Sequence, residues 1–374
     1  MWGGTGYGFA DAWSLPSRSR RMRDVVAWVK THRWETVSGV LGVLLVSSLA
    51  VLAVNLDDPP EQVAVDTTTT TLAPVTTTLD SQTTVPGDEA VTTTSFSQVE
   101  GPSGVTAVVV DNVANVGFQV GIAEADLLIE TPVEGGITRF TAIYGQEIPE
   151  LVGPVRSLRP VSADILALFR PVVFTTGGQP FVTGAVSATG TSIVTPEMSV
   201  AFQSLERPQP HHVFVSPGAD VSGGVDVALP WGSGEWEGGE PAPEVTLPIA
   251  EGTTWRFEDS VYVRYREGEP QLALTSVDGE PQPLNRETLI VMVANRKSAG
   301  YVDSAGFDVP TFDVVGGGAL YVLHSGEMIQ GTWFRASQAA DYTFTDEEGD
   351  AISVPTGSLY WAIVPDGQLI DFGG

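Results

Sequence analysis

Three arginines lie close together in a chain that is otherwise short of cations. Arg139, Arg156 and Arg159 fall within residues 133–160, VEGGITRFTAIYGQEIPELVGPVRSLRP, a segment punctuated by glycine and proline. Residues 57–374 hold 12 lysines and arginines against 43 aspartates and glutamates, a net charge of −31. A guanidinium group can bind a carboxylate or a phosphate through two parallel hydrogen bonds. The cluster therefore predicts either a site for an anionic ligand or a set of internal ion pairs.

Neighbouring residues could complete an anion site. Gly135 and Gly136 would let the backbone approach a ligand closely, because glycine has no side chain. A helix is expected to begin near Val161, and Ser157 or Ser162 could cap it. The first amides of that helix would then add hydrogen-bond donors for an anion.

Carboxylates and a histidine offer a second set of groups. If the predicted strands pair side by side, Glu134 and Asp111 are the carboxylates nearest the arginines. Histidine titrates near neutral pH, so His211 could transfer a proton, although a hydrogen-bonded structural histidine is the simpler interpretation. In an enzyme, Glu134 or His211 would act as the base.

The arginines could instead brace loops through internal ion pairs, with the neighbouring glycines serving only as turn residues. The pairs that the sequence offers are Arg139 with Glu130 or Glu134, and Arg156 or Arg159 with Asp126 or Asp164. The sequence leaves both interpretations open.

The periodicity of apolar residues predicts the elements that position these side chains. Around the arginines we expect strands at 106–112, 125–133, 137–145 and 171–178, and a helix at 161–170. The two glycines that follow Glu134 predict a hairpin turn between the second and third strands. A strand, a hairpin, a helix and a strand in this order indicate a mixed sheet with packed helices.

The second half of the chain has a different pattern. After about residue 245, short alternating strands are separated by Gly or Asp turns, with hairpins expected at Ser325-Gly326 and Glu348-Gly349-Asp350. We therefore predict an α+β fold. Its first domain, residues 105–240, is a mixed sheet with packed helices, and its second, residues 245–374, is mostly β.

The first hundred residues predict a membrane anchor and a stalk. Residues 36–56 carry no charge, and 21 residues at about 1.5 Å each can cross a hydrocarbon core of about 30 Å. Residues 1–35 carry a net charge of +3 and are expected to be a cytoplasmic basic flank. Residues 57–104, rich in threonine and without Lys or Arg, predict a disordered stalk. We expect a single-pass cell-membrane protein with extracellular C-terminal domains; a cleaved secretory signal is the alternative.

Composition and the absence of known motifs argue against several classes of function. The chain has no cysteine, so disulfides, thiolate chemistry and a lipid anchor on cysteine are not expected. His211-His212 lacks the spacing of a zinc site, and we predict no metal and no cofactor. Phosphate-loop, nucleophile-elbow and zinc-protease motifs are absent from the sequence. The acidic balance disfavours nucleic acid as a partner.

Several sequence blocks occur together in a known family. The blocks are VVVDN at 108–112, EADLLIETPVEGGITRF at 124–140, GPVRSLRP at 153–160, Gly-Gly at 177–178, PHHVFVS at 210–216, IQGTWFRAS at 329–337 and TFTDEEGDAISVPTGSLYWAIVP at 343–365. Together they resemble the N- and C-terminal domains of the DUF3048 family, the YerB-like bacterial envelope proteins. The chain departs from the family pattern at His212, where asparagine is usual. The resemblance implies an extracytoplasmic protein without an established activity, and because relatives are often lipoproteins, the missing cysteine implies that this chain uses its transmembrane helix instead.

The residues and the resemblance together give one predicted site. Its ligand-binding residues are Asp111, Asn112, Gly135, Gly136, Arg139, Arg156, Ser157, Arg159, Gly177, Gly178 and His211. The anchor, the stalk and the lack of a catalytic motif favour a binding protein over an enzyme, with an anionic wall-related ligand or an envelope protein as partner. The alternative is a hydrolase or transferase acting on an anionic cell-wall precursor, in a layout similar to LytR-CpsA-Psr transferases. A third possibility is a structural module whose arginines only hold the fold.

Overall fold

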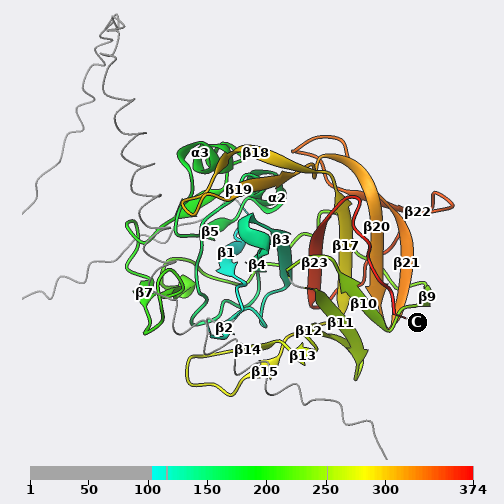
Figure 1. Cartoon of the computed structure of the whole chain (residues 1–374), viewed down its shortest axis with the longest axis horizontal. Helices are drawn as coiled ribbons and strands as arrows, with labels where there is room; N and C mark the ends of the chain where they lie inside the picture. The colour runs from blue at the N-terminus through cyan, green and yellow to red at the C-terminus, as the bar shows by residue number, and fades with distance from the viewer. Residues whose placement is uncertain (1–102, 115–116, 251, 374) are drawn as a thin grey trace, which may run out of the picture. The chain divides into compact units, whose positions relative to one another are not determined.

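A large mixed β-sheet dominates the computed structural model, which describes residues 103–114, 117–250 and 252–373 (Figure 1). In these ranges eleven strands join one sheet, in the order β22-β21-β20-β17-β23-β3-β4-β1-β5-β6, with β9 beside β21. The predicted flank, the transmembrane segment and residues 57–102 of the predicted stalk lie outside the described residues. Among the described helices, none has the length and apolar character needed to cross a membrane.

The two halves of the chain share this sheet. The first half contributes β1 (Thr106–Asp111), β3 (Leu127–Pro132), β4 (Thr138–Tyr144), β5 (Val172–Phe174) and β6 (Ser192–Val194). The rest contributes β9 (Glu240–Pro241), β17 (Thr288–Ala294), β20 (Gly316–His324), β21 (Glu327–Arg335), β22 (Thr343–Asp346) and β23 (Leu359–Pro365). The halves meet where β23 pairs in parallel with β3. Residues on either side of the predicted boundary at 240–245 therefore form one continuous sheet.

Strand direction decides which residues gather at one end of the sheet. β1 is parallel to β5, and β5 to β6, while β23 is parallel to both β17 and β3. β4 runs antiparallel between β3 and β1, so these two neighbours also run the same way. The carboxyl ends of β1, β3 and β5 consequently lie at the same end of the sheet, the end where open α/β sheets usually bind ligands.

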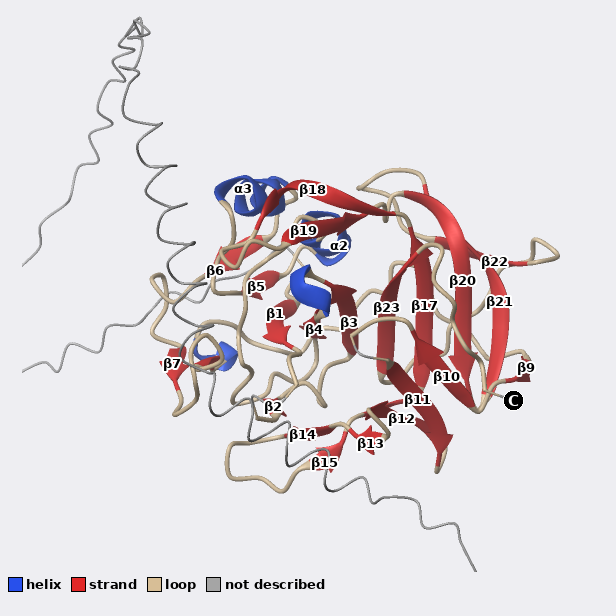
Figure 2. Ribbon diagram, viewed as in Figure 1, coloured by secondary structure: helices blue, strands red, loops and turns tan. Residues whose placement is uncertain are grey.

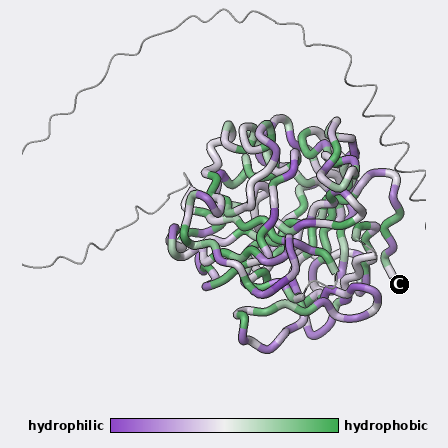
Figure 3. The backbone as a smooth tube through the Cα atoms, turned by 60° about the vertical axis from the view of Figure 1, so that its left-hand side comes forward, coloured by the Kyte–Doolittle hydropathy of each residue, from purple (hydrophilic) through white to green (hydrophobic). Residues whose placement is uncertain are grey.

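Two helices cover one face of the sheet. These are the predicted helix α2 (Ser162–Phe169) and a second helix, α3 (Pro180–Ala188), which was not predicted from the sequence. They pack Ile165, Leu166, Phe169, Val182 and Val186 into the same core as Ala107 and Val109 of β1. Val108 and Val110 point to the opposite face, into a second core shared with Trp255 and Tyr262. Figure 3 shows the apolar segments concentrated in the interior between hydrophilic surface loops.

Smaller sheets and turns surround the large sheet (Figure 2). One contains β10 (Glu244–Leu247), β11 (Thr253–Glu258), β12 (Val261–Arg266), β13 (Glu269–Pro270) and β16 (Asn285–Arg286). The others are β2 (Gln119–Val120) with β14 (Leu272–Leu274) and β15 (Gln282–Pro283), β7 (Phe202–Ser204) with β8 (Val213–Val215), and β18 (Arg296–Val302) with β19 (Asp308–Phe312). Two single-turn 3-10 helices, η1 (Glu134–Gly136) and η2 (Pro217–Ala219), complete the described elements.

The β-rich α+β prediction is confirmed. The described part of residues 245–374 contains strands and turns but no helix. The predicted hairpin at Ser325-Gly326 joins β20 to β21, and both turn residues have positive φ, 54° and 79°. The predicted strand at 171–178 is shorter than expected, because the chain leaves the sheet after Phe174 and turns toward the arginine segment.

Candidate functional site

The site begins at the carboxyl end of β1, where two charged residues face each other. Asp111 is paired with Arg139 of β4 in the strand register, so their side chains emerge on the same face of the sheet. This is the face that α2 and α3 cover. Both side chains are buried, Asp111 completely. Sheet geometry therefore fixes an opposite-charge pair at the end where the neighbouring loops converge.

The turn between β3 and β4 supplies a second carboxylate. Gly135 and Gly136 adopt φ values of 73° and 75°, which L-residues with side chains rarely take. The turn they form places Glu134 against two arginines. Nη2 of Arg139 lies 3.2 Å from Oε1 of Glu134. Arg159 donates to the same carboxylate twice, from Nε to Oε2 at 2.7 Å and from Nη2 to Oε1. Glu134 therefore holds two of the three guanidinium groups.

Asp111 holds the third arginine and the histidine. Nε of Arg156 lies 3.5 Å from Oδ2 of Asp111, and Nδ1 of His211 is hydrogen-bonded to the same oxygen. Arg156 also donates from Nη1 to the Pro210 carbonyl at 3.3 Å. The carboxylate of Asp111, the last residue of β1, thus contacts both the arginine loop and a loop a hundred residues further along the chain.

Backbone hydrogen bonds hold the arginine loop in place. The Ser157 carbonyl accepts a bond from Arg139 Nη1 at 2.6 Å, and the Gly177 carbonyl accepts one from the Leu158 amide at 2.8 Å. Gly178 packs against the same loop, since a Cβ there would lie 3.4 Å from the Leu158 carbonyl oxygen. The loop after β5 therefore supports the segment that carries Arg156 and Arg159.

The charges of this network do not balance. Three guanidinium groups face two carboxylates, in a chain whose net charge is −28. Burial, and then the charges of Arg159 and Arg156, lower the pKa of Arg139 to about 9, although the two carboxylates oppose this shift. Within the described part of the chain, Asp111 Oδ1, Arg139 Nε and Arg156 Nε are buried without a hydrogen-bond partner. The cluster thus carries excess positive charge and unused hydrogen-bonding capacity.

Only part of the network is open to solvent. The Arg139 side chain is 5% exposed, whereas those of Arg156, Arg159 and His211 are 19%, 16% and 15% exposed. Arg156, Arg159 and His211 are therefore the partly solvent-exposed members of the network, while Arg139 is buried and donates to Glu134 and the Ser157 carbonyl.

Glu134 gives this site a testable pH dependence. Burial alone would raise the pKa of Glu134, but the hydrogen bond from Arg159 and the charge of Arg139 outweigh it and hold that pKa below 4.5. Its carboxylate therefore stabilises the fold above pH 4.5, and this stability is lost as the pH falls through the lower folded-state pKa. We expect the difference in melting temperature between the wild type and Glu134→Gln to be constant near neutral pH and to shrink below pH 4.5. Glu244→Gln, in an exposed ion pair, should give a small difference throughout; a Glu134→Gln difference that persists undiminished to about pH 3 contradicts the assignment.

Asn112, a predicted ligand-binding residue, lies apart from the arginine cluster: it points to the opposite face of the sheet, where it donates to Glu130 and Thr138. The predicted serine cap is absent from α2: Ser162 accepts a bond from the Arg159 amide, and Ser157 is bonded to Thr176.

The predicted anion donors of α2 and most of the alternative ion pairs are also wrong. The first amides of α2 are bonded to backbone carbonyls of residues 159–161, so they are not available to an anion. Of the ion pairs that the sequence offered, only Arg139 with Glu134 is present among the described residues. Asp126 accepts from the Gly145 amide and Asp164 from Gln338 instead.

A second buried polar network, which was not predicted from the sequence, lies on the other face of the sheet. Glu130 accepts two bonds from Arg264 Nη2, at 2.8 and 2.9 Å, and one from the Tyr360 hydroxyl at 2.6 Å. Gln271 links Arg264 to Asn112. The sequence did contain a signal for the burial of Arg264: in the alternating strand VYVRYR, it points to the same side as the buried Tyr262.

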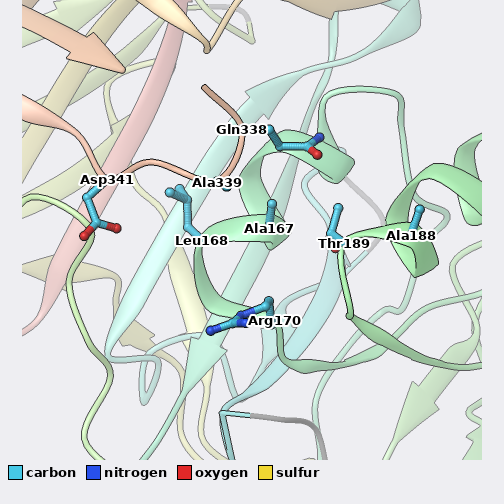
Figure 4. A pocket seen from close by; sticks show the side chains of 8 residues that line it. All are labelled: Ala167, Leu168, Arg170, Ala188, Thr189, Gln338, Ala339 and Asp341. Carbon is cyan, nitrogen blue, oxygen red and sulfur yellow. The ribbon is translucent and has the colours of Figure 1, made fainter. Parts of the chain in front are cut away.

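Two hollows lie near the arginine loop and helices. One, of about 360 Å³, borders the η1 turn and includes Glu134, Gly135 and Gly136 together with the exposed pair Arg296 and Asp308. The other, of about 380 Å³, lies at the opposite end of α2, between Arg170, Thr189, Gln338 and Asp341 (Figure 4). The latter contains none of the predicted site residues. In the described ranges, no group of three or more His, Cys, Asp or Glu side chains is placed to hold a metal ion.

The fold and the site thus define a class of protein: an α+β unit built on a mixed sheet, with a buried arginine cluster at the carboxyl ends of its strands. Two family descriptions match the sequence: "Protein of unknown function (DUF3048) N-terminal domain" over residues 92–225 and its C-terminal counterpart over residues 245–361. Because the two matches together span well over half of the sequence, the chain belongs to the DUF3048 family.

A structural match and a sequence match both lead to the YerB protein of Bacillus subtilis. The crystal structure of the YerB protein superposes with a TM-score of 0.57 at 20% identity, covering 72% of this chain and 93% of that one. At this identity the likeness concerns the fold alone. "Putative lipoprotein YerB" of strain 168 is 53% identical over 53 residues, which are 14% of this chain and 16% of that protein. The sequence match therefore spans only a small part of that relative's length.

Proposed function

We propose that this protein is a component of the bacterial cell envelope that binds a carboxylate- or phosphate-bearing ligand at Arg156, Arg159 and His211. One observation carries the proposal. In a strongly acidic chain, three guanidinium groups share two carboxylates at the carboxyl ends of the strands, and the outer two reach solvent. An incoming anion would supply the missing negative charge at the exposed edges of Arg156 and Arg159.

The position in the envelope is supported by the family and by the sequence. A relative bears the name "Putative lipoprotein YerB", and lipoproteins are membrane-attached. In this chain, the uncharged segment at 36–56 would serve as the anchor, with the folded unit outside the membrane beyond the stalk. The ligand would then be a component of the wall, or an acidic segment of another envelope protein.

Replacing Arg156 tests the binding proposal. Isothermal titration of the full chain in mild detergent with inorganic phosphate and with acetate should detect binding by the wild type. Arg156→Ala should weaken it roughly tenfold or more, because a hydrogen bond to a charged group contributes about 1.5–3 kcal/mol and about 1.4 kcal/mol is tenfold in affinity. Arg256→Ala is the matched control, since it removes an exposed arginine paired with Glu244. Equal affinities for all three proteins would contradict the proposal.

A second candidate function is proton-transfer catalysis on an anionic cell-wall precursor. The specific observation that favours it is the hydrogen bond between His211 Nδ1 and Asp111, since a carboxylate that orients an imidazole is a common feature of general bases. Arg156, beside the same carboxylate, would stabilise developing negative charge. Hydrolysis of a phosphorylated precursor that is lost in His211→Gln while acetate binding persists would support this reaction. Retention of full turnover in that variant would exclude His211 as the base.

A further inference from the structure

Three aromatic side chains lie on elements next to the arginine loop and the η1 turn. Phe181 lies in the first turn of α3, Tyr301 on β18, and Phe307 immediately before β19. Phe181 is 57% exposed and Phe307 is 54% exposed, although side chains of this size are usually buried. We call these three residues the aromatic rim.

Two members of the rim contact each other, and one of them follows the loop that supports the arginine segment. The rings of Phe181 and Tyr301 meet edge to face, with centroids 5.2 Å apart and planes at 88°. Phe181 stands three residues after Gly178, whose loop is hydrogen-bonded to Leu158 beside Arg159. The β18–β19 ribbon thereby reaches α3 (Figure 2).

Phe307 lies beside the η1 turn. A Cβ on Gly135 would lie 3.9 Å from its ring, and Gly135 follows Glu134, the carboxylate that holds Arg159. The glycine at this position therefore leaves the ring next to the backbone of the turn with no side chain between them. Phe307 is therefore connected to Arg159 through Gly135 and Glu134, and Phe181 through the loop that ends at Gly178.

The charges of the cluster also act on Tyr301. Burial raises the pKa of Tyr301, and the charges of Arg159, Glu134 and Arg139 act on it as well. Tyr301, which contacts Phe181, therefore belongs to the electrostatic surroundings of Arg159 and Glu134.

We infer that the aromatic rim and Arg159 together take a sugar ring that bears a carboxylate. This inference rests on the proposed anion site and specifies its ligand class. The C–H groups on one face of a pyranose are apolar and can stack on an exposed ring. The carboxylate would pair with the exposed edge of the Arg159 guanidinium group, whose Nε and Nη2 already donate to Glu134, and the hydroxyls would meet the Tyr301 hydroxyl. A bare anion would leave Phe181 and Phe307 uncovered.

Charge and area argue against other occupants. The cluster offers an excess of a single positive charge in a chain of net charge −28, which suits one carboxylate at a time better than a polyphosphate. Three side chains are also too small a surface for a stable protein partner, which needs about 800 Å² on each side. A monosaccharide acid, or one acidic unit of a longer glycan, fits both limits.

Paired ligands and paired variants test the inference on the full chain in detergent. Titration calorimetry with glucuronic acid, glucose and acetate should show glucuronate binding roughly three- to tenfold more tightly than acetate, with no detectable binding of glucose. Phe181→Ala and Tyr301→Ala should each remove that advantage and leave acetate affinity unchanged, while Tyr301→Phe should retain the stacking. Phe334→Ala is the control, because Phe334 is an equally exposed aromatic (56%) on the distant strand β21.

The outcomes separate this inference from the proposed function. If glucuronate and acetate bind equally and Phe181→Ala changes neither, the sugar is not the ligand, and the anion site stands alone. If a short peptide with a free carboxylate gains more from the rim than glucuronate does, the sugar assignment is also overturned. If no anion binds the wild type, both proposals fall. Because Phe181 is mostly solvent-exposed, the Phe181→Ala protein is expected to fold normally. A change in its glucuronate affinity would therefore report on binding and not on misfolding.

Discussion

Arg264→Ala is expected to lower the free energy of unfolding by about 3–5 kcal/mol, because it leaves a charge buried without its partner. The Arg264 and Glu130 side chains are both fully inaccessible, and Arg264 Nη2 contacts both carboxylate oxygens of Glu130. Removing the arginine deprives the buried carboxylate of its counter-charge. The hydroxyls of Tyr360 and Thr138 would still donate to it, but they do not neutralise it.

The position of the Arg264–Glu130 pair explains why its loss should destabilise the whole folded unit. Glu130 lies on β3, in the first half of the chain, and Arg264 lies on β12, in the second half. Tyr360 of β23 donates to the same carboxylate at the strand that joins the two halves of the sheet. Loss of the pair therefore weakens the junction between the halves, and we expect one cooperative transition at lower denaturant concentration.

Denaturant unfolding followed by tryptophan fluorescence measures this effect. Arg256→Ala, which breaks an exposed pair, should cost no more than about 1 kcal/mol. The double variant Glu130→Leu with Arg264→Met should be more stable than Arg264→Ala alone, because it removes both charges and keeps most of the volume. An Arg264→Ala protein as stable as the Arg256→Ala control would mean that Glu130 does not depend on Arg264 for its counter-charge.

Local sequence patterns predicted the elements near the site well. The expected strands at 106–112 and 137–145 match β1 and β4 within one residue at each end, and the expected helix at 161–170 matches α2 equally closely. These elements have continuous apolar runs or helical spacing, which depend only on neighbouring residues. The missed helix α3 was also readable, since Pro180 stands at its first position and Val182 and Val186 have helical spacing.

The partners of the charged side chains were harder to predict, because they come from distant segments. Asp111 meets His211 a hundred residues later, and Glu130 meets Arg264 134 residues later. No periodicity encodes such pairings, which depend on sheet order and on how the halves pack. The scarcity of cations identified the arginine cluster. That Arg139 is buried, while Arg156 and Arg159 are partly exposed, depends on the tertiary packing of the strand and the loop that carry them.

Glu134→Gln should have two opposite consequences. Glu134 accepts from Arg139 and from two nitrogens of Arg159, so the neutral amide would leave two guanidinium groups without their shared counter-charge. We expect a loss of about 3 kcal/mol in unfolding free energy, at the lower end for a buried pair because Arg159 is partly exposed. The freed arginines should in turn bind acetate or phosphate about tenfold more tightly than in the wild type, since the internal carboxylate no longer competes for them.

The combination of these two measurements separates the interpretations that the sequence left open. A site whose carboxylate competes with an external anion loses stability and gains affinity in the same variant, and added phosphate should restore part of its melting temperature. A set of purely structural ion pairs loses the stability alone, with no gain in anion affinity and no rescue by phosphate. Arg139→Lys provides a further check, because a lysine keeps the charge but not the fork that spans Glu134 and the Ser157 carbonyl. That variant should be destabilised while the anion contacts at Arg156 remain, so that a collapse of phosphate binding in Arg139→Lys would place the anion deeper than the exposed edge of the cluster.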